Sequence, residues 1–307
     1  MGLKCGIVGL PNVGKSTLFN ALSSAKAEAA NFPFCTIEPN VGVVTVPDKR
    51  LQILEGLVNP QKVVPTVIEF VDIAGLVKGA SKGEGLGNKF LGNIREVDAV
   101  IHVIRCFDDP NVVHVAGGVD PIFDKEVIDT ELQLKDIESV DKKLLRIEKV
   151  AKSGDAKAKK AIESLHKFKE ALKEGKNARV VDADEDDLEA IADIHLLTIK
   201  PVLYVANVDE DSIKEGNAYV EKLKAEVSQE NAEVIVLCAA LEEQIAEFED
   251  PEEKEMFLGE YGLEESGLNR LIAAGYKLLN LITYFTAGVQ EVRAWTITKG
   301  WKAPAAA

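Results

Sequence analysis

Short stretches rich in Val and Ile recur along this chain of 307 residues, and most of them are apolar on both faces. Such stretches are typical of the central strands of a parallel sheet. We expect strands at residues 3–8, 41–46, 66–73, 99–106, 202–207 and 234–238. Amphipathic helical patterns lie between most of them, at residues 15–23, 50–57, 89–96, 218–227 and 268–281. This alternation predicts a doubly wound, mostly parallel α/β sheet that binds ligands at the carboxyl ends of its strands.

Residues 127–197 interrupt the alternation. Apolar residues recur there at the spacing of three and four that is typical of a coiled coil: Ile137, Val140, Leu144, Ile147 and Ala151. After a turn at residues 153–154, a second apolar stripe follows: Ile162, Leu165, Phe168 or Lys169, and Leu172. The pattern predicts an inserted antiparallel helical hairpin. The sheet domain would then be discontinuous, formed by residues 1–126 and 198–282.

The end of the chain reads differently again. Residues 290–298 alternate between apolar and polar positions, which predicts a strand. One strand cannot bury itself. We therefore expect it either to pair with the main domain or to begin a further α+β domain, of which residues 283–307 would be the start.

Composition narrows the class of protein. With 46% hydrophobic and 28% charged residues, the chain is typical of a globular protein rather than a disordered or fibrous one. Four scattered cysteines without Cys-x-x-Cys spacing exclude a disulfide scaffold and a zinc ribbon, and favour a reducing compartment. We see no signal-peptide pattern and no apolar run that could span a bilayer, so we expect a cytoplasmic protein without a membrane partner.

Charge is unevenly distributed. The net charge of −15 argues against nucleic acid covering the whole surface. Residues 142–179 nevertheless carry 13 Lys and Arg against 5 Asp and Glu, and residues 182–193 carry seven acids and no base. The lysine-rich hairpin therefore suggests an anionic partner such as RNA, although a solvated helical face would look the same.

Residues 9–16 match the phosphate-binding motif G-x-x-x-x-G-K-[ST], between an expected strand and an expected helix. Backbone N–H groups of such a loop cradle phosphate oxygens. Lys15 would stabilise the charge on the terminal phosphates during the reaction, and the Ser16 hydroxyl would bind Mg²⁺. The nucleotide-binding candidates in this loop are Asn12, Val13, Gly14, Lys15, Ser16 and Thr17.

A second motif, Asp-x-x-Gly, closes the strand at residues 66–73. Asp72 would hold Mg²⁺ through water, and the amide of Gly75 would contact the γ-phosphate. The glycine-rich segment that follows suits a part of the chain that becomes ordered with that phosphate.

Three runs together resemble the YchF branch of the Obg-like translation-factor NTPases: residues 9–17, residues 31–40 (Asn-Phe-Pro-Phe-Cys-Thr-Ile-Glu-Pro-Asn) and residues 72–91. The likeness covers essentially the whole chain. It implies a nucleotide-binding domain interrupted by a helical hairpin and followed by a TGS domain. It also implies a preference for ATP over GTP, association with ribosomes, expected at the large subunit, and a role for Thr36 as a further Mg²⁺ ligand. Residues 285–289 and 293–296 resemble the start of the TGS domain, most of which we expect to be missing.

The choice of base can be judged at residues 207–210. GTP-selective relatives carry Asn-Lys-x-Asp there, whereas this chain has Asn-Val-Asp-Glu. The longer carboxylate cannot keep the same bidentate contact with guanine, and an unmatched buried polar group costs about 1–3 kcal/mol. This weakens the preference for guanine, and the resemblance then favours ATP. The base-binding candidates are Asn207, Val208, Glu210, Cys238 and Ala239.

The residue after Asp-x-x-Gly is Leu76, which cannot orient the attacking water as a glutamine would. His114, in a loop after a central strand, is our candidate for that role, and Asn12 could instead bind K⁺. His102 should be a satisfied core histidine. The sequence thus predicts a ribosome-associated Mg-ATPase that acts as a switch in translation. A GTPase and a nucleotide-binding module with negligible turnover remain as alternatives.

Overall fold

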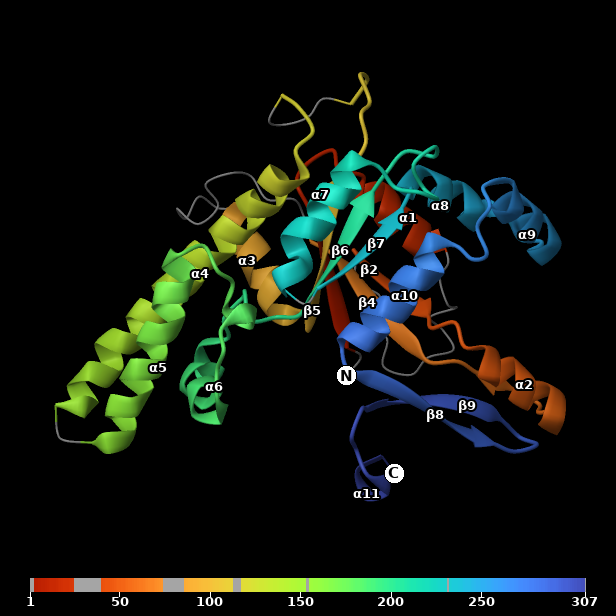
Figure 1. Cartoon of the computed structure of the whole chain (residues 1–307). Coiled ribbons are helices and arrows are strands. Elements are labelled where there is room, and N and C mark those ends of the chain that lie inside the picture. Colours follow the sequence, from red (N-terminus) through yellow and green to blue (C-terminus); the bar gives the residue numbers. More distant parts are fainter. Residues whose placement is uncertain are drawn as a thin grey trace.

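The structure is a computed structural model that describes residues 3–24, 40–73, 86–112, 117–152, 155–230 and 232–306. At its centre lies a six-stranded sheet of order β2-β4-β1-β5-β6-β7 (Figure 1). Its strands are β1 (Lys4–Val8), β2 (Val41–Thr45), β4 (Val67–Asp72), β5 (Ala99–Arg105), β6 (Val202–Asn207) and β7 (Glu233–Leu237). Every pairing except β2–β4 is parallel, which confirms the predicted mostly parallel α/β sheet.

Helices cover both faces of this sheet. In chain order the α-helices of the described residues are α1 (Lys15–Ser24), α2 (Lys49–Val58), α3 (Leu86–Glu96), α4 (Pro121–Ala151), α5 (Ala156–Lys173), α6 (Glu185–Ile191), α7 (Ala218–Val227), α8 (Ala239–Glu247), α9 (Pro251–Glu260), α10 (Gly267–Leu278) and α11 (Ala303–Ala306). Helices α3, α4 and α7 lie on one side, and α1, α8 and α10 on the other (Figure 1). Strands β5 and β6 are buried along their whole length, as their apolar sequences predict. Within the described residues, none of the helices has the length and apolar character needed to cross a bilayer.

Strand β2 corrects one expectation. Its apolar sequence predicts a central parallel strand, but it runs antiparallel to β4 at the edge of the sheet. Helix α1 packs against β2 on the face of Gly42 and Val44, so Val44 is buried even at the edge. The apolar pattern reports this burial and carries no information about strand direction.

The end of the expected helix at residues 268–281 also differs. Helix α10 stops at Leu278, Asn280 takes a left-handed conformation with φ of 56°, and Leu281 opens strand β8 (Leu281–Ala287). Because the buried Leu281 belongs to the same core as the helix, helical spacing alone could not show where the helix ends.

The strand expected near the end of the chain is β9 (Val292–Thr298), which pairs with β8 on one side and with the short β3 (Val63–Val64) on the other. This small sheet packs on α2, where Leu51, Val292 and Ala294 are buried together. The strand therefore pairs with a segment of the main domain as well as with its own neighbour.

The helical hairpin is formed by α4 and α5, which extend away from the sheet (Figure 1). Its own core contains Val140, Leu144, Leu165 and Phe168, so Phe168 rather than Lys169 continues the apolar stripe. Helix α4 begins at Pro121, and its Ile128 packs in the main core. The boundary expected at residue 127 therefore falls inside a continuous helix.

Four α-helices of the described residues were not expected from the sequence: α6, α8, α9 and α11. Helix α6 lies within the acidic tract at residues 182–193 and begins with a capping box formed by Asp184 and Asp187. Helix α9 begins with Asp250 as its N-cap, followed by Pro251. Both starts carry a recognisable capping signal, which the high density of acidic residues obscured.

Candidate functional site

The predicted phosphate loop connects β1 to α1, which starts at Lys15. Gly14 has φ of 89°, and a Cβ atom there would lie 2.1 Å from Nδ2 of Asn207. A Cβ on Gly9 would lie 2.7 Å from the carbonyl oxygen of Val103. Both positions therefore require glycine, and the loop is pressed against the carboxyl ends of β5 and β6. The buried side chain of Val13 leaves only the backbone of that residue for a ligand.

Lys15 and Asp72 meet at this edge, because β4 lies beside β1 and ends in Asp72. The Lys15 ammonium forms an ion pair with the Asp72 carboxylate. Ser16 is exposed in the first turn of α1, as is needed for its hydroxyl to reach a ligand. A carboxylate and a hydroxyl beside a phosphate loop are hard oxygen donors, which suit Mg²⁺. These residues therefore fit the predicted metal site.

Asn207, at the end of β6, joins two loops. Its Nδ2 donates to the carbonyl oxygen of Val13 at 2.9 Å, and its Oδ1 accepts from the N–H of Ala239 at 2.9 Å. Both polar ends of this buried amide are thus engaged within the protein. Asn207 positions the phosphate loop against the loop after β7.

Beside this junction lies a cavity of about 420 Å³. Its lining residues come from the carboxyl ends of β5, β6 and β7: Phe107, Asp108, Asp109, Pro110, Asn207, Val208, Asp209, Glu210, Asp211, Cys238 and Ala240. The Glu210 side chain is exposed and accepts from the hydroxyl of Tyr261 at 3.3 Å. Burial raises the pKa of the Cys238 thiol, so Cys238 presents a neutral surface.

The structure thus brings together most of the predicted site. The phosphate-loop part of the site contains residues 12–17 and Asp72. The cavity is lined by four of the predicted base-binding residues: Asn207, Val208, Glu210 and Cys238. Ala239 is buried and is not among the residues that line the cavity, whereas the neighbouring Ala240 is. Thr36, Gly75, Leu76 and His114 lie outside the described residues, so their roles stay predictions.

The wall formed by residues 107–110 was not predicted. It follows β5, whose carboxyl end the doubly wound topology places at the same edge as the phosphate loop. The position of this segment after a central strand was the signal in the sequence that could have indicated the wall.

His102 is buried in β5, and its ring centroid lies 5.6 Å from that of Tyr204. Its Nε2 has no hydrogen-bond partner among the described residues. Burial lowers the pKa of His102 to about 4, so the ring is neutral at physiological pH. The expectation of a core position is confirmed, but that of a satisfied ring is wrong.

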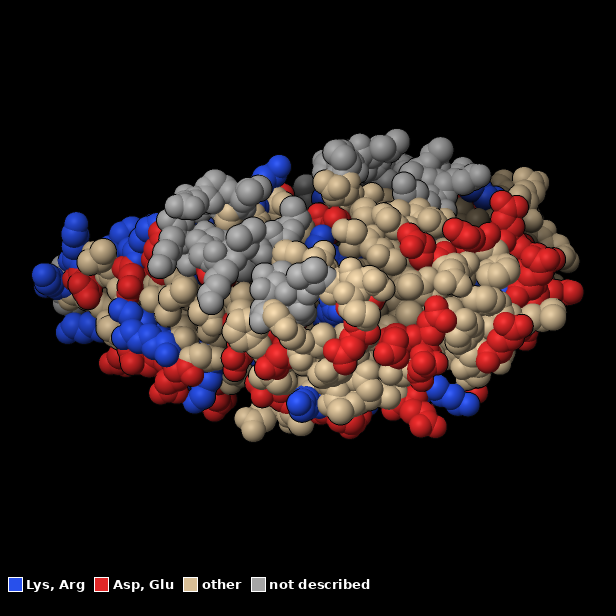
Figure 2. Space-filling model, turned by 90° about the horizontal axis from the view of Figure 1, so that it is seen from above, with Lys and Arg blue, Asp and Glu red and all other residues tan. Residues whose placement is uncertain are grey.

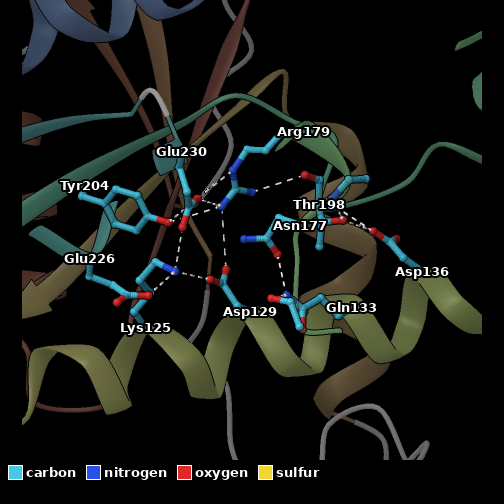
Figure 3. A network of polar contacts seen from close by, with 12 residues as sticks. Lys125, Asp129, Gln133, Asp136, Asn177, Arg179, Thr198, Tyr204, Glu226 and Glu230 are labelled. Carbon is cyan, nitrogen blue, oxygen red and sulfur yellow. Dashed lines mark hydrogen bonds and ion pairs between the residues drawn. The ribbon is translucent and has the colours of Figure 1, made fainter. Parts of the chain in front are cut away.

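A buried polar cluster fixes the base of the hairpin, and we call it the clamp: Lys125, Asp129, Arg179, Tyr204 and Glu230 (Figure 3). Lys125 Nζ lies 2.9 Å from Asp129 and 2.7 Å from Glu230. An Arg179 NH group lies 2.6 Å from the same Glu230 carboxylate. The clamp connects α4, the segment after α5, β6 and the short helix η5 (Ser228–Glu230).

A further pair of contacts orients the returning chain beside the clamp. Asp136 accepts from the N–H groups of Leu197 and Thr198, at 2.7 and 2.8 Å (Figure 3). Gln133 donates to Asn177 at 2.9 Å. One face of α4 thereby holds both ends of the segment that leads back into the sheet.

At the far end of the hairpin, the acidic tract meets the lysines. Four ion pairs join it to α4 and α5: Lys143–Asp193, Lys157–Glu189, Lys160–Asp186 and Lys167–Asp187. Four exposed cations near the turn form no ion pair with a described residue, and we call them the tip cations: Arg146, Lys149, Lys152 and Lys159. Figure 2 shows Lys and Arg gathered at this end of the molecule and Asp and Glu over much of the rest.

Comparison with known proteins places the chain in a family. Residues 4–181 match a family described as 50S ribosome-binding GTPase, and residues 281–307 match the C-terminal family of YchF GTPases, described as a protein of unknown function. The chain is 60% identical to the ribosome-binding ATPase YchF of Bacillus subtilis, over 99% of this chain and 83% of the relative. It is 56% identical to the protein of the same name from Escherichia coli O157:H7, over 100% and 84%.

A solved structure agrees. The YchF GTPase of Schizosaccharomyces pombe is 40% identical, with a TM-score of 0.88 over 99% of this chain and 83% of that one. Since these identities extend over almost its whole length, the chain belongs to the YchF family.

Proposed function

We propose that this protein binds Mg-ATP, hydrolyses it, and acts as a nucleotide-dependent switch on the ribosome. The observation that carries the proposal is the meeting of Lys15, Ser16 and Asp72 at one edge of the sheet, beside a cavity of about 420 Å³. Relatives named ribosome-binding ATPases support both the reaction and the partner. A ribosomal partner also implies work in the cytoplasm.

In the proposed mechanism, catalysis consists of positioning and electrostatic stabilisation. The backbone of residues 12–17 and the amide of Gly75 bind the phosphates. Lys15 stabilises negative charge as it develops. Ser16, Thr36 and, through water, Asp72 would hold Mg²⁺, which when bound would neutralise charge on the phosphate oxygens. Because Asn207 holds the phosphate loop, it keeps this arrangement in register with the cavity.

We propose that the cavity takes the base and prefers adenine to guanine. The Val208 side chain is buried, so it cannot stack on a base as the lysine of GTP-selective relatives would. Glu210 is exposed and already accepts from Tyr261, which does not favour a bidentate contact with guanine. The remaining base contacts are assigned to Cys238 and the backbone next to Ala239.

Water activation is assigned to His114, because Leu76 can neither donate nor accept a hydrogen bond. A neutral imidazole can accept a proton near pH 7. K⁺ bound at Asn12, which has φ of 64°, is the second possibility. His114→Ala should then lower ribosome-stimulated turnover about tenfold with ATP affinity preserved, whereas Asn12→Ala should abolish any advantage of K⁺ over Na⁺.

We propose that the ribosome contact is at the large subunit and includes RNA bound by the hairpin. The match to a 50S ribosome-binding family supports the subunit. The pairing pattern narrows the RNA surface to the tip cations, since the carboxylates of the acidic tract neutralise Lys157 and Lys160. Lys and Arg neutralise RNA phosphates and release counterions.

The reaction is tested by steady-state turnover of Mg-ATP and Mg-GTP, each with and without ribosomes. We expect ATP to be the better substrate and ribosomes to raise its turnover. A reversed preference would show a GTPase. Tight binding of nucleotide without turnover under either condition would show a nucleotide-binding module instead.

A further inference from the structure

Arg105, the last residue of β5, is an arginine enclosed in the protein interior. Its exposed fraction is 1%, and it forms no ion pair with any described carboxylate. Its guanidinium donates instead to three main-chain carbonyls. The acceptors are Phe107 at 3.1 Å, Val112 at 3.0 Å and Asp109 at 3.3 Å.

These carbonyls belong to one short loop, residues 106–112, which therefore folds around a cation. The Phe107 ring stacks on the guanidinium, with 4.5 Å between the guanidinium carbon and the ring centroid. The N–H of Asn111 donates to the Asp109 carboxylate at 2.8 Å, and Asn217 donates to the carbonyl of Cys106 at 2.7 Å. The buried guanidinium therefore holds this loop through its main-chain carbonyls.

The same loop forms one wall of the candidate nucleotide cavity, through Phe107, Asp108, Asp109 and Pro110. The opposite wall comes from residues 207–211, and β5 and β6 hold the two walls together because Arg105 pairs with Asn207 in register. Asn207 is thus bonded to the phosphate loop, whereas Arg105 is bonded to the far wall of the cavity.

We propose that Arg105 is a positioning residue that fixes the base-side wall of the nucleotide cavity and thereby sets affinity for the nucleoside part of the substrate. This inference rests on the proposed function. Arginine suits the role because its planar fork donates in several directions at once, which a lysine ammonium on a flexible stem does not reproduce. Without the fork, buried carbonyls lose their donors and the wall rearranges.

Arg105→Lys tests the proposal, with two probes measured by calorimetry: Mg-ATP, and Mg-tripolyphosphate, which has no nucleoside. We expect affinity for Mg-ATP to fall about tenfold, as the loss of one or two buried hydrogen bonds implies, while affinity for Mg-tripolyphosphate stays unchanged. Arg50→Lys is the matched control, since Arg50 is an exposed arginine of α2 paired with Asp48. It should change neither affinity.

The selectivity of the loss separates positioning from general damage. If both affinities fell together, Arg105 would be acting on the phosphate loop or on the whole fold, and the inference would be wrong. It would also be wrong if neither affinity changed. Should the wild-type protein bind neither probe, the proposed function itself would fail, which is a different result from a failure of Arg105.

Pro110→Gly provides a second variant in case Arg105→Lys does not fold. Pro110 is exposed in the same wall, so this change loosens the loop without touching the buried guanidinium. We expect a smaller loss of affinity, again confined to Mg-ATP. An unchanged ratio of the two affinities in this variant would contradict the role of the wall.

Discussion

The two ends of α4 carry charge in different environments. Lys125 and Asp129, near its start, are buried in the clamp with Glu230, whereas Arg146 and Lys149, near its end, are exposed. The helix has 31 residues, so about 46 Å of rigid rod separates its two ends. Charges at the base are paired and desolvated. Charges at the tip are exposed, and they either form ion pairs at the surface or form none with a described residue.

This difference assigns different roles to the two ends. A buried pair costs desolvation, but breaking it leaves an uncompensated charge, so the clamp fixes where the hairpin leaves the sheet. Exposed pairs contribute little to stability and weaken with salt. Their main effect at the tip is to neutralise Lys157, Lys160 and Lys167, which leaves the tip cations as the surface that we propose for an anionic partner.

Breaking the clamp should have the largest effect. Arg179→Met removes the cation that contacts Glu230 and Tyr204, and leaves Glu230 with Lys125 and the hydroxyl of Tyr204. We expect the free energy of unfolding to fall by about 3–5 kcal/mol, as for a buried pair that loses one partner. Urea denaturation measures the change. A loss below about 1 kcal/mol would show that the clamp contributes no more to stability than exposed ion pairs do, and would contradict the difference between the two ends of α4.

Neutralising the tip cations should come next. We expect replacement of all four by Gln to lower affinity for ribosomal RNA about a hundredfold at moderate salt and to reduce the salt slope by about three. Filter binding over a salt series measures both values. The matched control neutralises Lys157, Lys160 and Lys167, which are already paired, and should change the slope far less. Equal effects of the two sets would show that the pairing with the acidic tract does not select the surface.

The smallest of the three expected effects is the contribution of the clamp to the pH dependence of the free energy of unfolding. Burial tends to raise the pKa of Glu230, but Arg179 and Lys125 outweigh it, so the pKa lies below the ordinary value of 4.5. A lowered carboxylate pKa stabilises the folded state above pH 4.5, and this stabilisation is lost as pH falls through the folded-state pKa.

Glu230→Gln should therefore flatten the fall of unfolding free energy below pH 4.5. Glu226→Gln is the control, since this carboxylate lies 3.9 Å from Lys125 and is more exposed. It should keep the wild-type slope. An unaltered slope in the Glu230 variant would assign the acid sensitivity to other carboxylates.

Much of the fold and of the phosphate site could be predicted because their signals are local. The central strands β5 and β6 read as apolar runs, and the phosphate loop is a contiguous motif followed by a helix. The spacing of apolar residues predicted the hairpin. The sequence left open whether Phe168 or Lys169 continues its second apolar stripe, and the structure shows that Phe168 does.

The remaining features depend on contacts between distant segments. Nothing near Lys125 in the sequence shows that Glu230 will approach to 2.7 Å. The carbonyls around Arg105 come from residues 107, 109 and 112, close to it in the sequence, but their convergence on the guanidinium depends on the folded shape of the loop. The charge asymmetry of residues 142–179 was visible, but its cancellation by α6 required the folded chain. Within this run the sequence does not distinguish Lys157 and Lys160, which the structure pairs with carboxylates, from Lys159, which forms no ion pair with a described residue.

The central claim is that nucleotide bound at Lys15 controls association with ribosomes, and co-sedimentation of wild-type protein and Lys15→Ala with ribosomes tests it most directly. Lys15 lies at the phosphate loop, where it pairs with Asp72, and it is not part of the hydrophobic core. The variant should therefore keep its fold, which circular dichroism can check. We expect wild-type binding to differ between Mg-ATP, Mg-ADP and no nucleotide, and Lys15→Ala to bind equally under all three conditions. A variant that still responded to Mg-ATP as the wild type does would contradict the account.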